Sequence, residues 1–173
     1  PIKGLHDIFE AENRWEGQSY WLQRAAATPD ELKALLDRVE RRLEDLRAFL
    51  LPPDWDKARA AFLAAGGTLP YYRSQRGPVT FAMSVYDVEE LIYLIMDEPA
   101  LAERFSRLIL RAILERARVL DEEAGCAPET ARHGWSWADD NCAMLNKEMY
   151  DFFAKPILKA VFDRYCPLPG DGR

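Results

Sequence analysis

Two adjacent carboxylates, Asp139 and Asp140, follow the short apolar run 133–138 and precede Asn141. Neighbouring residues of a strand face opposite sides of a sheet, so we expect at most one carboxylate to enter a given pocket. Burying such charges beside a hydrophobic strand is costly, and a closed pocket would raise the pKa of one carboxyl group so that it acts as an acid. We interpret Asp139 and Asp140 as candidate catalytic groups and Asn141 as a candidate substrate contact. A solvated turn capped by neighbouring amides is the alternative.

A second polar group follows two tyrosines at 71–72, where Arg73, Gln75 and Arg76 lie close together in the sequence. The planar guanidinium fork matches the geometry of a carboxylate. We therefore predict that Arg73 and Gln75 bind an anionic substrate. The alternative is that Arg73 pairs with a nearby acid and that Arg76 stays in solvent.

The remaining reactive or aromatic side chains favour packing over chemistry. A reactive thiol needs a nearby cation or base, whereas Cys142 lies beside two carboxylates. Trp135 and Trp137 share one face of their run, which favours packing over a stacking platform for a ligand. With His6 and His133 as the only histidines, we predict no metal site within the chain.

The elements that must position these residues alternate between helices and short apolar runs. Strands are predicted over 68–72, 79–83 and 133–138 because each is short, apolar and bounded by turn residues or polar residues. Helical turns are predicted in the first 27 residues, and amphipathic helices are predicted from their three- and four-residue apolar spacing. These helices cover 30–49, 54–65, a short stretch from Asp87, Pro99 to Gly125, and Asn146 to about Tyr165.

Local signals predict where several of these helices begin and end. Thr28 and Glu31 form a capping box around Pro29, which suits the first helical position. Pro156 lies inside the last helix and is expected to kink or divide it.

This order of elements predicts an α/β fold, specifically a helix-rich portion of a (β/α)8 TIM barrel with two or three parallel strands. Such a barrel places its chemistry where the strands end, and a closed one needs about 250 residues, whereas this chain has 173. Uncovered strand edges would require the rest of a barrel or a second copy of the chain. We predict a single domain over 1–173, interpreted as a barrel fragment with a helical part at 1–67 and β/α units at 68–166.

Charge and composition limit the classes of partner. The net charge of −6, from 23 basic and 29 acidic side chains, argues against a nucleic-acid surface, which needs a basic face. No run of 18 apolar residues is present, so no membrane span is predicted. The three cysteines form no CxxC pair, which is typical of reduced thiols in a cytoplasmic protein. Both ends of the sequence look like cuts in a longer polypeptide or like processed ends.

The segment from Leu69 to Tyr165 resembles the uroporphyrinogen decarboxylase superfamily in the order and spacing of several short motifs. These are Gly77-Pro78-Val79-Thr80-Phe81, Glu123-Ala124-Gly125, the acidic pair Asp139-Asp140 with the cap Asn146-Lys147-Glu148, and Phe153-x-x-Pro156-x-x-Lys159. The resemblance implies a TIM-barrel enzyme of porphyrin biosynthesis that removes carboxylates from a tetrapyrrole without a cofactor. Related members are cobalamin-linked methyltransferases that activate a thiol on zinc.

The sequence departs from the decarboxylase pattern at several positions. The family's tyrosine falls at Ser84, with Tyr86 two residues further on, and its serine falls at Asp140. Tyr86 is therefore the candidate catalytic phenol, and Ser84 is a candidate substrate contact. The arginine-rich early segment and the late histidine of the family are absent.

Together, these observations lead us to expect a uroporphyrinogen decarboxylase-like carboxy-lyase that acts on a small anionic substrate and uses no cofactor. Asp140 and Asp139 would orient or protonate the substrate, and Arg73 would bind its carboxylate. One alternative is a corrinoid-linked methyltransferase with zinc and cobalamin. Another is a non-catalytic barrel fragment that associates with itself, for instance as a homodimer.

Overall fold

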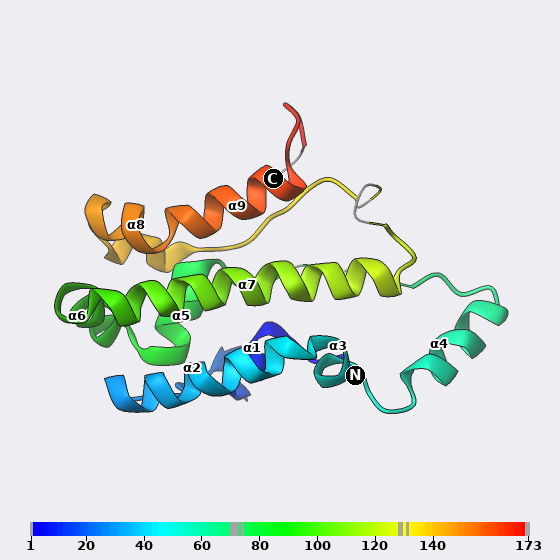
Figure 1. Cartoon of the computed structure of the whole chain (residues 1–173), viewed down its shortest axis with the longest axis horizontal. Coiled ribbons are helices and arrows are strands. Elements are labelled where there is room, and N and C mark those ends of the chain that lie inside the picture. The colour runs from blue at the N-terminus through cyan, green and yellow to red at the C-terminus, as the bar shows by residue number, and fades with distance from the viewer. Residues whose placement is uncertain (1, 70–72, 74, 128–129, 131, 172–173) are drawn as a thin grey trace.

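The computed structural model describes residues 2–69, 73, 75–127, 130 and 132–171. The described part of the chain is built almost entirely from helices arranged in three layers (Figure 1). The 25-residue helix α7, Pro99–Glu123, forms the middle of the structure. It contacts α2 (Pro29–Glu44) on one side and α9 (Lys155–Tyr165) on the other.

The first layer contains the N-terminal elements. Gly17 has φ +65° and closes the tight turn of a two-stranded antiparallel hairpin, a conformation that glycine adopts without strain. The Thr28 side chain accepts from Glu31 N–H at 3.2 Å, and Glu31 reaches back to Ala27 N–H at 2.7 Å, so the predicted helix start is confirmed. The elements are α1 (Leu5–Ile8), β1 (Asn13–Glu16), β2 (Ser19–Leu22), α2 and α3 (Leu46–Leu50).

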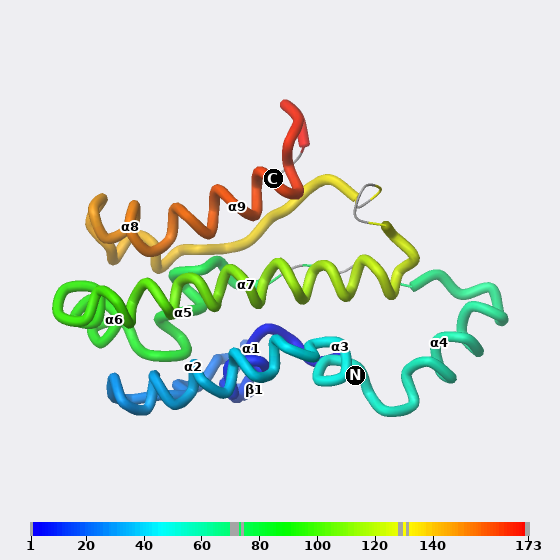
Figure 2. The backbone as a smooth tube through the Cα atoms, viewed as in Figure 1, coloured from blue at the N-terminus to red at the C-terminus, as the bar shows by residue number. Residues whose placement is uncertain are grey.

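Helix α4, Trp55–Ala64, extends away from the three layers and has no buried residue (Figure 2). It is linked to α7 by hydrogen bonds, because Trp55 Nε1 donates to the Glu123 carboxylate at 2.6 Å and Arg59 Nε donates to the Glu123 carbonyl at 2.9 Å, and Trp55 also packs against the core.

In the middle and last layers, helices begin or divide at the capping residues and the proline that the sequence indicates. Asp87 caps one helix by accepting from Glu89 N–H, and Asn146 caps another by accepting from Met149 N–H. The last predicted helix is divided at Ala154, two residues before Pro156, as the proline predicts. The remaining elements are α5 (Pro78–Tyr86), α6 (Val88–Asp97), the 3-10 helix η2 (Asp140–Met144) and α8 (Lys147–Phe153).

An aromatic cluster at Phe105 joins the three layers. The Phe105 ring lies 6.1 Å from Phe9, 6.5 Å from Tyr86 and 5.9 Å from Phe153, measured between ring centroids. These rings come from the first layer, from α5 and from α8, and all four side chains are buried. Edge-on and tilted aromatic pairs contribute beyond their buried area, so this cluster fixes the spacing between the layers.

The α/β prediction is wrong. The described strands form only the antiparallel pair β1–β2, so the chain is not a portion of a (β/α)8 barrel with parallel strands. Residues 79–83, predicted as a strand, lie inside α5. A helix that is apolar all round shows no clear periodicity, and Gly77-Pro78 is a helix start, because Pro78 occupies the first helical turn.

Three further segments differ from the predicted elements. Residues 133–138 pair with no described strand, although burial alternates along the segment from Trp135 to Ala138 as it does in a strand. The N-terminal segment contains the β1–β2 hairpin in addition to the helical turn α1. Within 68–72, the structure assigns no strand at Thr68 or Leu69, and residues 70–72 lie outside the described residues.

Replacing Phe105 tests the aromatic cluster. Phe105→Ala should lower the free energy of unfolding by about 3–5 kcal/mol, because it removes a buried ring and leaves a cavity between three layers. Tyr93→Ala, at an exposed aromatic residue on α6, should change it by less than about 0.5 kcal/mol. Urea unfolding followed by circular dichroism measures both, and equal losses in the two variants would contradict the role assigned to the cluster.

The corner between α1 and β1 depends on an ion pair. Glu10 has a φ of +57°, and its carboxylate accepts from Arg38 Nε at 2.8 Å and Arg38 Nη2 at 2.7 Å, and also from Arg42. The hydrogen bond from Arg38 lowers the pKa of Glu10 to about 2, assisted by Arg42. Because this pKa is depressed in the folded state, the ion pair stabilises the fold above pH 4.5 and loses its effect as the pH falls towards 2.

Glu10→Gln should therefore reduce the difference in unfolding free energy between pH 7 and pH 3 by about 1–2 kcal/mol, after allowance for solvent screening. The measurement is denaturant unfolding of both proteins at each pH. Glu16→Gln, at an exposed residue of β1 without an ion pair to a described residue, is the matched control and should leave the difference unchanged.

Candidate functional site

Asp139 caps the N-terminus of α5 instead of standing at the mouth of a sheet. Its Oδ1 accepts from Thr80 N–H at 2.8 Å, and the carbonyl of Ala138 accepts from Gly77 N–H at 2.7 Å. In return, Asn141 N–H donates to Thr80 Oγ1 at 3.2 Å. The segment 138–141 and the first turn of α5 are therefore joined in both directions, and we call this arrangement the α5 clasp.

The clasp requires a glycine at position 77. A Cβ atom on Gly77 would lie 2.3 Å from Cβ and 2.6 Å from Oδ1 of Asp139. The φ of Gly77 is −63°, which any residue can adopt, so the constraint is the close approach of the two chains and not the backbone conformation.

Burial raises the pKa of Asp139 above its usual value, and the hydrogen bonds from Thr80 oppose this shift only in part. The Oδ2 atom is buried and has no hydrogen-bond partner among the described residues. Asp140 begins η2 and is exposed, and its charge raises the pKa of Asp139 a little further. The acidic pair thus has unequal environments, with one carboxyl group that retains its proton to higher pH.

A cavity of about 1010 Å³ lies between the segment 136–142 and α9. Trp137, Asp139, Asp140 and Cys142 contribute to its lining. Burial raises the pKa of the Cys142 thiol, and Asp139 and Asp140 act in the same direction. This thiol is therefore not activated as a nucleophile.

Arg73 is buried and does not line the cavity beside α9. Its guanidinium carbon lies 4.1 Å from the centroid of the Tyr165 ring and 5.5 Å from that of Trp135. Its Nε is 3.4 Å from Asp121 Oδ1, and its Nη2 donates to the carbonyl of Arg132. These contacts match the predicted alternative in which Arg73 pairs with a nearby acid.

The two candidates on α5 are held by local contacts. Ser84 Oγ donates to the carbonyl of Thr80 at 2.7 Å within the helix. Tyr86 is only 1% exposed and packs against Phe105, and burial raises the pKa of its phenol. The structure therefore groups Asp139, Asp140 and Asn141 in the clasp, but it leaves Arg73, Tyr86 and Gln75 in three other environments.

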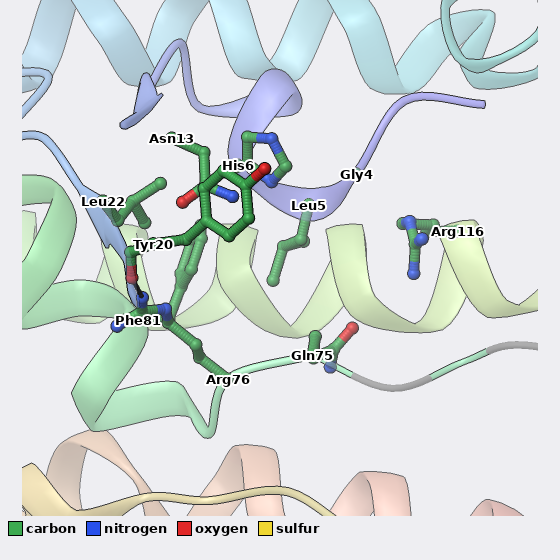
Figure 3. Close-up of a pocket in the computed structure, with 10 residues that line it drawn as sticks. All are labelled: Gly4, Leu5, His6, Asn13, Tyr20, Leu22, Gln75, Arg76, Phe81 and Arg116. Carbon is green, nitrogen blue, oxygen red and sulfur yellow. Dashed lines mark hydrogen bonds between the residues drawn. The ribbon is translucent and has the colours of Figure 1, made fainter. Parts of the chain in front are cut away.

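Gln75 belongs to a second cavity, of about 230 Å³, which we call the arginine pocket (Figure 3). It lies between the hairpin and α1 on one side and the segment before α5 on the other. Its lining consists of Gly4, Leu5, His6, Asn13, Tyr20, Leu22, Gln75, Arg76, Phe81 and Arg116.

The polar lining of the arginine pocket is positive or neutral. Arg116 is 7% exposed on the buried face of α7, and its Nε lies 3.5 Å from the carbonyl of Lys3. Arg76 Nη2 donates to the carbonyl of Tyr20 at 3.2 Å. In the view of Figure 3, Gln75 lies between the two arginines, and both polar atoms of its side chain are buried without a hydrogen-bond partner among the described residues. No Asp or Glu is among the described residues that line this pocket.

The sequence reasoning missed most residues of the arginine pocket. Arg116 lies on the face of α7 that carries Ile113 and Ala117, and a charged residue on an apolar stripe is a signal that was available. Tyr20 and Asn13 belong to the hairpin, whose signal was Gly17 between aromatic runs. The contribution of His6 depends on the tertiary position of α1 and has no local signal.

Comparison with known protein families, curated proteins and solved structures finds no match for this chain. Within the described residues, none of the helices combines the length and the apolar character needed to cross a bilayer. The described cysteines Cys126, Cys142 and Cys166 are free thiols. No described group of three or more acidic, histidine or cysteine side chains is arranged to hold a metal ion.

Substitutions at Asp139 test whether this residue acts as a helix cap or as a charged functional group. Because folding raises the pKa of Asp139, its stabilising contribution is present below the unfolded value of about 3.8 and is lost as the pH rises through the folded value. At pH 7, Asp139→Asn should therefore be as stable as the parent or more stable, whereas Asp139→Ala should lose about 1–2 kcal/mol with the cap. Thermal unfolding measures both. A loss in Asp139→Asn as large as that in Asp139→Ala would show that the clasp needs an ionised carboxylate.

Proposed function

We propose that this protein binds a small anionic molecule in the arginine pocket. The observation that carries the proposal is the charge of the lining: Arg76 and Arg116 contribute guanidinium groups, and no Asp or Glu is among the described residues that line the pocket, although the Asp7 carboxylate lies 3.5 Å from His6 Nε2. The whole chain carries a net charge of −6, so the sign of this pocket is opposite to that of the protein. A cleft with one sign of charge and low-dielectric walls concentrates ions of the opposite sign.

The pocket offers the contacts that a carboxylate or phosphate group needs. The guanidinium groups present N–H donors in a planar fork, and charge-assisted hydrogen bonds of this kind are about twice as strong as neutral ones. Among the described residues, Arg76 forms no ion pair, so its charge is available to a ligand. The side-chain amide of Gln75 adds a donor and an acceptor that are already withdrawn from water, so a ligand would supply the partners they lack.

For the reaction, we propose decarboxylation of the bound anion, because the sequence resembles the uroporphyrinogen decarboxylase superfamily and because the pocket is suited to carboxylates. In this reaction the bond to the carboxyl carbon breaks, CO2 leaves, and the electron pair stays on the substrate carbon, which takes up a proton. His6 and Tyr20 are the lining residues with a proton to transfer. Solvent would return the proton, and nearby positive charge would stabilise the electron pair.

The other residues and functions predicted from the sequence have different parts in this proposal. Asp139 and Asp140 do not line the arginine pocket; the α5 clasp acts on it by fixing Gly77, the residue after Arg76. Tyr86 and Arg73 have structural contacts. No specific contact favours the corrinoid-linked methyltransferase or the self-associating fragment. A cytoplasmic location agrees with the free thiols and remains part of the proposal.

The test is anion-dependent stabilisation. A ligand at one hundred times its dissociation constant stabilises the folded state by about 2.7 kcal/mol, so phosphate and small carboxylates should raise the melting temperature above that in chloride of equal ionic strength. Arg76→Gln should abolish most of this rise, and Arg76→Lys should retain part of it. Arg14→Gln, at an exposed arginine of β1 that pairs with Glu12, is the control and should behave like the parent.

Circular dichroism in chloride first establishes that each variant is folded. The proposal is wrong if Arg76→Gln and Arg14→Gln respond to the anions as the parent does, because the stabilisation would then come from exposed cations and not from the arginine pocket.

A further inference from the structure

The β1–β2 hairpin has two faces with different surroundings. Its register pairs Trp15 with Tyr20 and Arg14 with Trp21, and side chains alternate between faces along a strand. Asn13, Tyr20 and Leu22 line the arginine pocket, so one face of the hairpin forms a wall of that pocket. Trp21 belongs to the opposite face and does not line the pocket.

The pocket-facing side of the hairpin presents an aromatic surface. In Figure 3 the Tyr20 ring is drawn beside Asn13 and Leu22, among the residues that line the pocket. The Trp15 ring lies 4.9 Å from it at an interplanar angle of 71°, which fixes the orientation of the tyrosine from one side. Both rings remain more than half exposed, Trp15 at 60% and Tyr20 at 56%, so the Tyr20 ring retains surface that a ligand can cover.

The positive charge of Arg76 and the aromatic ring of Tyr20 lie close together on the hairpin side of the arginine pocket. Arg76 Nη2 donates to the carbonyl of Tyr20, so the same residue supplies the ring and holds the guanidinium group. A molecule whose anionic group lies between Arg76 and Gln75 would place the atoms next to that group beside the tyrosine ring. Leu5, Leu22 and Phe81 complete an apolar lining around this position.

The volume of the pocket suits a small ligand. A buried apolar cavity of about 150 Å³ accepts one benzene molecule, and the arginine pocket measures about 230 Å³. The difference accommodates one charged group of a few atoms attached to a single ring. A tetrapyrrole, with its four linked rings, would extend well beyond this volume.

From these observations we infer that the arginine pocket selects anions that carry one aromatic ring, such as aryl carboxylates, with Tyr20 as the specificity-determining residue and Trp15 as its positioning residue. The inference rests on the proposed function, because it takes the pocket to be an anion site. It adds the class of molecule: a monocyclic aromatic acid whose ring packs on Tyr20 while its carboxylate meets Arg76.

Three probe molecules of similar size distinguish the contribution of the aromatic ring to binding from that of the negative charge. Benzoate carries both, cyclohexanecarboxylate carries the charge on a saturated ring, and benzamide carries the ring without the charge. Calorimetric titration should show benzoate binding roughly three- to tenfold more tightly than cyclohexanecarboxylate, which is the range for one aromatic contact. Benzamide should bind at least about tenfold more weakly than benzoate, since it lacks the ion pair with arginine.

Two hairpin variants assign the preference to the pocket-facing ring. Tyr20→Leu should remove the preference for benzoate over cyclohexanecarboxylate. Trp21→Leu is the matched control, because Trp21 is the next residue, is also 56% exposed and belongs to the opposite face. This variant should keep the preference, which also shows that altering the hairpin surface does not by itself disturb the pocket.

The possible results lead to different conclusions. Equal binding of benzoate and cyclohexanecarboxylate, with benzamide much weaker, would overturn the aromatic inference and leave the anion site intact. The same conclusion follows if Tyr20→Leu retains the preference for benzoate. Binding of benzamide as tight as that of benzoate, or binding of none of the three, would overturn the anion site and with it this inference.

Discussion

The burial of helix α7 between two layers is the constraint on which the rest of the structure depends. The helix packs against α2 on one side and α9 on the other, and its buried residues include apolar side chains over nearly its whole length. Because burial of each large apolar side chain contributes about 1.5–3 kcal/mol, this helix orders both neighbouring layers at once. It also carries Arg116 into the interior beside α1. The arginine pocket is therefore a consequence of the packing of α7 as much as of the residues before α5.

The segment from Gln75 to Thr80 connects the two candidate regions. On one side, Gly77 and Thr80 receive the clasp from 138–141. On the other, Gln75 and Arg76 enter the arginine pocket. Burial of the Asp139 carboxyl group raises its pKa, so the clasp holds this segment at a cost in electrostatic free energy at neutral pH. The clasp thereby fixes the position of Gln75 and Arg76 at the edge of the arginine pocket.

Several elements could be predicted from the sequence because their signals are local. Thr28 with Glu31, Asp87, Asn146 and Pro156 each act within a few residues, and helices begin or divide close to them. The strand prediction for 79–83 failed because a short run that is mostly apolar and mostly buried has the same appearance in a helix and in a strand. Once that run was taken as a strand, residues 133–138 completed a parallel unit that the structure does not contain.

The candidate site was less predictable because it depends on contacts between distant residues. Thr80 and Asp139 are 59 positions apart, and a carboxylate after an apolar run gives no sign that it caps a helix elsewhere in the chain. The sequence predicted Arg73 and Gln75 as substrate contacts, and of these two only Gln75 lines the arginine pocket, whereas His6, Tyr20 and Arg116 reach the same pocket only through the packing of α1, the hairpin and α7.

The most direct test of the account is to observe which side chains respond to an anion. In nitrogen-15 NMR spectra recorded during titration with benzoate, the Nε–H signals of Arg76 and Arg116 and the amide signals of Gln75 should shift together with one dissociation constant. The exposed arginines Arg14 and Arg118 should stay unchanged. Shifts confined to exposed arginines, with Arg76 and Gln75 unaffected, would contradict the account.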